Sequence, residues 1–146
     1  GWVTFAPVVW VKSNPPPRFA GDGPTSSCEY ICVARPRRRV RDSGSRPGHY
    51  NVLTQMDRGS KGGGGFVGAK DPEGMAALVR DYSEPTDTIV DAYAGSGTTL
   101  LAAMLEGRRA IGSECDPNTF RLASERLAGL GPSLTKHGQL SLLVPA

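Results

Sequence analysis

In the second half of the sequence, a short apolar strand leads into a glycine turn and then into an apolar helix, an order of elements that few folds share. The sequence predicts the strand at 88–91, the turn at Gly95-Ser96-Gly97 and the helix at 98–107. A strand followed by a helix begins a βαβ unit, whose strands pair in parallel. Glycines at such a turn expose backbone N–H groups to a ligand without intervening side chains.

The segments around this unit extend it into an α/β domain with a mostly parallel sheet. The expected elements are a helix from residue 72 capped by Asp71, a strand at 109–114, a helix at 117–130 capped by Asp116, and a short strand at 140–144 in an irregular tail. The residues expected to face inward from the last helix are Phe120, Leu122, Ala123 and Leu127.

The first part of the chain predicts strands and long loops but no helix. An apolar, β-branched segment at 3–12 predicts a strand, and Pro7 indicates a bend or an edge early in it. A second strand is expected at 29–34, so the two would form an antiparallel pair joined by a long Pro-rich loop. Residues 35–68 show neither a helical nor a strand period and predict a loop or small insert.

Charge and composition exclude several classes. Residues 33–68 hold eight basic and two acidic side chains, a net charge of +6, whereas the whole chain carries +3. No apolar run reaches the roughly 18 residues of a membrane span, and no secretory leader is evident, so we expect a cytoplasmic protein. Three cysteines do not make a disulfide scaffold, and Cys28 and Cys32 lack partners for a metal site, so buried thiols are expected.

The glycine turn is compatible with several ligands. A P-loop requires Lys where Thr98 stands, and a dinucleotide fingerprint requires a small residue where Leu100 stands. S-adenosylmethionine needs close backbone approach and two carboxylates, one at its ribose and one near its charged amino end, which Glu114 and Asp91 can supply. The remaining alternative is that the glycines only turn the chain.

Residues 68–130 resemble the C-terminal half of the DNA methyltransferases that modify the exocyclic amine of adenine or cytosine. The residues at 91–99 read Asp-Ala-Tyr-Ala-Gly-Ser-Gly-Thr-Thr, where that family has D-P-F-x-G-S-G-T-T, so Ala92 and Tyr93 replace Pro and Phe. Other matching segments are Gly107-Arg108-Arg109 with Gly112-Ser113-Glu114, Lys70-Asp71-Pro72 with an inserted Asp, and the front strands with Trp10-Val11-Lys12 and Cys28-Glu29-Tyr30.

The resemblance implies the permuted, beta-class (phage-type) order of parts, with a Rossmann-like methyltransferase sheet that is incomplete here and carries an antiparallel strand pair at its N-terminal end. The implied layout is 1–34 as the end of the catalytic half, 35–68 as a basic target-recognition-like segment, 69–130 as the half that binds S-adenosylmethionine, and 131–146 as the tail. Double-stranded DNA is the implied partner, and the candidate contacts are Arg35, Arg37, Arg38, Arg39 and Arg41. A solvated loop is the alternative for this arginine run.

The catalytic motif of the family is Asp, Asn or Ser followed by Pro-Pro and an aromatic residue that stacks on a flipped base. Asn14, Pro15 and Pro16 match it in part, but Pro17 follows instead of an aromatic residue. The resemblance therefore implies that the catalytic motif lies upstream of Gly1 and that the chain is a C-terminal fragment inactive by itself. It also implies that Ile89 and Val90 lie beside an unpaired sheet edge with apolar side chains exposed. We expect such a fragment to be poorly stable.

The function implied by the resemblance is methyl transfer from S-adenosylmethionine to a base amine, with adenine N6 preferred, in a restriction-modification or phage setting. The implied cofactor-binding residues are Lys70, Asp91, Ala92, Tyr93, Ala94, Gly95, Ser96, Gly97, Thr98, Glu114 and Cys115. For Cys115 a small core residue is the expected role, and for Tyr93 core packing is the alternative. Two other functions remain open: a nucleotide-binding oxidoreductase fragment, and a DNA-binding remnant without catalysis.

Overall fold

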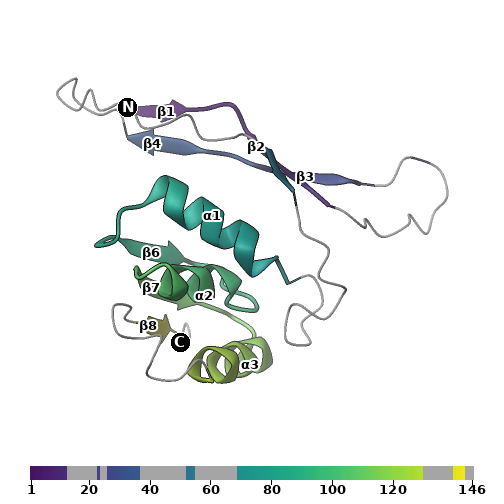
Figure 1. The fold of residues 1–146 in the computed structure, drawn as a ribbon. Helices are drawn as coiled ribbons and strands as arrows, with labels where there is room; N and C mark the ends of the chain where they lie inside the picture. The colour runs from purple at the N-terminus through teal and green to yellow at the C-terminus, as the bar shows by residue number, and fades with distance from the viewer. Residues whose placement is uncertain (13–22, 24–25, 37–51, 55–68, 130–139, 144–146) are drawn as a thin grey trace. The chain divides into compact units, whose positions relative to one another are not determined.

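The computed structural model describes residues 1–12, 23, 26–36, 52–54, 69–129 and 140–143 (Figure 1). The chain forms two compact units, Gly1–Asp57 and Arg58–Ala146. Among the described residues, no helix has the length and apolar character that a membrane crossing requires.

The first unit is built on a long antiparallel ribbon (Figure 1). Its strands are β1 (Trp2–Thr4), β2 (Val8–Val11), β3 (Cys28–Ile31) and β4 (Ala34–Pro36), with β1 pairing with β4 and β2 with β3. The predicted antiparallel pairing is confirmed, but each predicted strand is divided in two. Three residues separate β1 from β2 where two separate β3 from β4, so the ribbon bulges at Pro7, which has no N–H to donate.

A further strand, β5 (Val52–Thr54), pairs in parallel with β2 and gives the sheet order β3-β2-β5. This corrects the expectation that 35–68 contains no strand, because three residues are too short a run to show a period of two. In β2, Val8 and Trp10 are buried at 3% and 4% exposure. Trp10 is therefore a core residue of this unit.

The second unit contains a parallel sheet, as predicted from the βαβ pattern, and its three described strands follow one another across the sheet in chain order. Its strands are β6 (Thr88–Asp91), β7 (Arg109–Ser113) and β8 (Leu140–Leu143), and its helices are α1 (Pro72–Tyr82), α2 (Thr98–Leu105) and α3 (Pro117–Ala128) (Figure 1). Asp71 and Asp116 cap α1 and α3 as expected, accepting from the backbone N of Gly74 at 2.9 Å and of Thr119 at 2.7 Å.

The core of this unit surrounds α2. One cluster joins α2 to α1 through Ala76, Val79 and Ala102, and the other joins it to β7 and α3. The members of the second cluster are Ala94, Leu100, Leu101, Ala103, Met104, Ala110 and Leu127. Leu122, expected to face inward, is instead 42% exposed, because on α3 the buried face is the one that carries Ala123 and Leu127.

β6 is an edge of this sheet among the described strands, and its two apolar side chains differ. Val90 is 69% exposed, as expected for an unpaired edge. Ile89 is partly buried, because its side chain packs against both core clusters. The expected exposure is therefore confirmed for Val90 and wrong for Ile89.

Arg108 is a buried guanidinium that holds two connections together. Its Nε and Nη2 donate to Ser83 Oγ at 3.1 Å and to Ser83 O at 2.8 Å, and its Nη1 donates to Glu106 O at 2.6 Å. The side chain therefore ties the turn after α1 to the end of α2. Arg109 beside it is exposed and makes one longer hydrogen bond, to Thr86 O at 3.3 Å.

We expect Arg108→Ala to lower the free energy of unfolding by about 2–3 kcal/mol, because it leaves buried carbonyl groups without their charged donor. Arg109→Ala is the matched control and should change it by less than about 0.5 kcal/mol. Urea melts followed by circular dichroism measure both values. Equal effects of the two substitutions would contradict this role of Arg108.

Candidate functional site

The turn after β6 has a backbone shape that favours glycine at two positions. Gly95 has a φ of 51° and Gly97 a φ of 74°, both in the left-handed region. A Cβ on Gly97 would also lie 3.1 Å from Leu127 Cδ1, whereas among the described residues a Cβ on Gly95 would meet only Tyr93 O, at 4.0 Å. Gly97 is thus required for packing as well as conformation, while Gly95 leaves open space beside its backbone.

Hydrogen bonds tie this turn to the end of β7. The backbone N of Ala94 donates to Ser113 O at 2.9 Å, and Ser113 Oγ donates to Ala92 O at 2.8 Å. Within the turn, Gly97 N donates to Ala94 O at 2.7 Å. The turn is therefore fixed relative to the strand that precedes Glu114.

The Glu114 carboxylate lies at the glycine turn, as predicted from the adjacent ends of the two parallel strands. Its Oε2 accepts from Gly95 N at 2.9 Å, and its Oε1 accepts from Asp116 N at 2.9 Å. The Asp116 N–H has the largest effect and lowers the pKa of Glu114; burial opposes it by less, and the Gly95 N–H lowers the pKa further. The result is an oriented, ionised carboxylate whose oxygens keep lone pairs for further donors.

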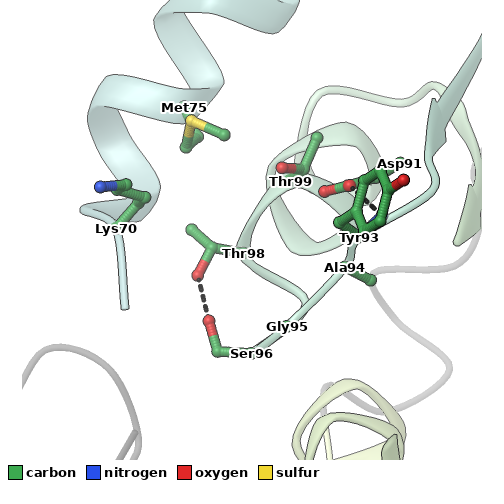
Figure 2. A pocket seen from close by; sticks show the side chains of 9 residues that line it. All are labelled: Lys70, Met75, Asp91, Tyr93, Ala94, Gly95, Ser96, Thr98 and Thr99. Atoms are coloured by element: carbon green, nitrogen blue, oxygen red, sulfur yellow. Dashed lines mark hydrogen bonds between the residues drawn. The ribbon is translucent and has the colours of Figure 1, made fainter. Parts of the chain in front are cut away.

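A pocket of about 190 Å³ opens beside the same turn. Its lining residues come from the start of α1, the end of β6, the turn and the start of α2: Lys70, Met75, Asp91, Tyr93, Ala94, Gly95, Ser96, Thr98 and Thr99. Figure 2 shows Lys70 and Met75 on one side of this space and Asp91, Tyr93 and Thr99 across from them. Gly95 therefore both lines the pocket and donates to Glu114.

The structure brings most of the predicted cofactor-binding residues to this pocket or to the carboxylate beside it. Besides Glu114, three predicted residues do not line the pocket. Ala92 is exposed, and Gly97 is a buried residue of the turn. Cys115 is exposed, with its Sγ 3.6 Å from Glu114 Oε1. The expectation that Cys115 belongs to the core is therefore wrong, because its strand has already ended at Ser113.

Tyr93 is 90% exposed, so the alternative of core packing is excluded for its ring. Its backbone N donates to Asp91 Oδ1 at 3.1 Å, which holds the aspartate side chain against the turn. Met75 and Thr99 line the pocket without being among the predicted cofactor-binding residues, although Thr99 is the last residue of the motif at 91–99. For Met75 the signal was helical spacing alone, which predicts the inner face of α1 without indicating that this face reaches the pocket.

Several sequence predictions fall elsewhere. Asn14, Pro15 and Pro16, and the arginines at 37, 38, 39 and 41, lie outside the described residues. Arg35 is exposed on β4, and its guanidinium lies 5.3 Å from the centroid of the Phe5 ring. The two front cysteines are not buried as expected: Cys28 is half-buried and Cys32 is exposed after β3 has ended. In the part of the chain that the structure describes, no cluster of metal-binding side chains forms.

The comparisons with known proteins place this geometry in a family. Residues 1–125 match the sequence model of the N6/N4 family described as DNA methylase. The chain belongs to this DNA methylase family.

Individual relatives agree with the family match. Type II methyltransferase M.XycI of Xanthomonas campestris pv. cyanopsidis is 29% identical over 146 residues, covering 88% of this chain and 46% of the relative. Type II methyltransferase M.SmaI of Serratia marcescens is 29% identical over 143 residues, covering 87% of this chain and 47% of the relative. The chain thus spans about half the length of these curated relatives.

Solved structures show the same fold. The putative DNA modification methylase TTHA0409 of Thermus thermophilus, solved in complex with S-adenosyl-L-methionine, superposes with a TM-score of 0.64 at 27% identity, covering 98% of this chain and 59% of that one. The M1.HpyAVI–SAM complex superposes with a TM-score of 0.65 at 23% identity, covering 87% of this chain and 63% of that one. The predicted fold, an α/β methyltransferase sheet with an antiparallel strand pair in the first unit, is confirmed.

The lowered pKa of Glu114 predicts an acid-dependent stability. An ionised carboxylate with a lowered pKa stabilises the fold fully above its ordinary pKa of 4.5, and this contribution is lost as the pH falls through the lowered value. We expect the difference in unfolding free energy between the wild type and Glu114→Gln to be largest near neutral pH and to shrink below pH 4.5. Urea melts at a series of pH values measure it, and a difference independent of pH would contradict the assignment.

Proposed function

We propose that this chain contributes the S-adenosylmethionine site of a DNA methyltransferase that acts on an exocyclic base amine, with adenine N6 preferred. The observation that carries the proposal is the hydrogen bond of 2.9 Å from Gly95 N to Glu114 Oε2, beside the pocket that holds Lys70 and Asp91. Support also comes from the family match and from TTHA0409, which was solved with this cofactor.

The residues fit the two ends of the cofactor. Glu114 offers fixed carboxylate oxygens to the two ribose hydroxyls, and Gly95 leaves open space where a nucleoside must approach the backbone. Asp91 and Lys70 line one pocket with opposite charges, which suits the ammonium and the carboxylate of the amino-acid end. The exposed ring of Tyr93 can cover the carbon chain between those ends.

The chemistry that S-adenosylmethionine supplies when bound is an electrophilic methyl group: its S–CH₃ bond breaks as the N–CH₃ bond forms, S-adenosylhomocysteine remains, and the base nitrogen loses a proton. The role of the residues above is to bind and orient. We propose double-stranded DNA as the substrate, with the arginine-rich segment that begins at Arg35 contacting phosphates.

If Glu114 binds the ribose hydroxyls, removing its carboxylate and removing the hydroxyls should weaken binding through loss of the same contacts. In calorimetry with S-adenosylhomocysteine, Glu114→Ala should weaken binding about 10- to 100-fold, because charged hydrogen bonds to the hydroxyls are lost. An analogue lacking the ribose hydroxyls should bind the wild type correspondingly more weakly, and Glu114→Ala should weaken the binding of this analogue by much less than it weakens the binding of S-adenosylhomocysteine.

The matched control is Glu125→Ala, because Glu125 is an exposed glutamate on α3 that pairs with Arg121. It should leave the affinity unchanged. If Glu114→Ala weakened the analogue as much as S-adenosylhomocysteine, Glu114 would be acting only as a brace for the turn. Tight binding of NADH, or salt-sensitive duplex binding with no affinity for S-adenosylhomocysteine, would overturn the proposed function.

A further inference from the structure

Arg126, in the last turn of α3, reaches from its own helix to the glycine turn. Its Nη1 donates to Ser96 O at 2.8 Å and to Thr98 Oγ1 at 3.2 Å. Ser96 Oγ and Thr98 Oγ1 also share a hydrogen bond of 3.0 Å (Figure 2). One guanidinium therefore contacts the residues on both sides of Gly97.

The contact to Ser96 O controls the orientation of a peptide plane. The carbonyl of Ser96 and the N–H of Gly97 belong to the same planar peptide, so fixing one direction fixes the other. That N–H donates to Ala94 O at 2.7 Å and closes the turn. Because Gly95 lies within this closed segment, the direction of its N–H toward Glu114 depends on the same closure.

The surroundings of Arg126 indicate more than a surface contact. The side chain is half-buried, and desolvation lowers its pKa without removing its charge. Thr98, one of its two acceptors, is only 4% exposed. Arg121, which lies earlier on the same helix, is exposed and pairs with Glu125 at 2.7 Å.

We propose that Arg126 is a positioning residue, which holds the glycine turn in its binding shape before the nucleoside arrives. This inference rests on the proposed function of the same site. A turn with two glycines samples many backbone states, and a turn that is already ordered does not lose that entropy on binding. α3 thus contributes to affinity through the turn, without touching the ligand.

The test uses Arg126→Met, which keeps most of the apolar stem and removes the donors. We expect S-adenosylhomocysteine to bind at least about 10-fold more weakly, by analogy with the loss of one charged hydrogen bond. In the unliganded protein, amide hydrogen exchange at Gly97 should become at least about 10-fold faster, while exchange in β7 stays unchanged. A purely structural brace would instead raise exchange throughout the unit.

Two further variants complete the experiment. Arg121→Met is the matched control and should leave both the affinity and the Gly97 exchange rate at wild-type values. Arg126→Lys keeps the charge but ends one bond short of the Nη1 position, so both readouts should be intermediate. If Arg126→Met does not fold, the Arg126→Lys variant decides the question. An affinity and a Gly97 exchange rate equal to those of the wild type would overturn the proposal, and intermediate values would support it.

The two proposals fail in different ways. If the wild type does not bind S-adenosylhomocysteine, the proposed function is wrong, and the Gly97 exchange rate alone then shows whether Arg126 orders the turn. If the wild type binds and Arg126→Met binds equally well with unchanged exchange, only the role of Arg126 is overturned.

Discussion

The contact between the Gly95 amide and the Glu114 carboxylate is the interaction on which the site depends. It joins the turn after one parallel strand to the residue that follows the next strand, and it does so at 2.9 Å. Parallel pairing of β6 with β7 brings the two segments to the same sheet edge, and the positive φ of Gly95 gives its backbone the required shape. A carboxylate held by two amides is ionised and oriented before any ligand is present.

Much of the second unit is predictable because its signals are local. The start of α1 follows from Asp71 as a cap before Pro72, and β6 follows from one apolar run between turn residues. In the first unit, Pro7 signals the break between β1 and β2, but the break between β3 and β4 and the strand β5 have no such local signal, because they depend on pairing between segments distant in sequence. The position of Glu114 is predictable because the end of a parallel strand determines it.

Other parts of the site depend on packing that no motif records. Leu100 stands where a dinucleotide site requires a small residue, yet it is fully buried, and the room for it comes from β7. A Cβ on Gly112 would lie 2.6 Å from Leu100 Cδ1. The position that must be small in this chain is therefore Gly112 on β7, not residue 100 on α2. Arg126 is similar: its helical position is evident in the sequence, but its reach to Ser96 is visible only in three dimensions.

A crystal structure of the chain grown with S-adenosylhomocysteine would show directly whether Glu114 binds the ribose. We expect the ribose hydroxyls within hydrogen-bond distance of the Glu114 carboxylate, with the amino-acid end in the pocket of Lys70 and Asp91. A nucleoside bound away from the glycine turn, or a Glu114 side chain directed into solvent while the ligand is bound, would contradict this binding mode.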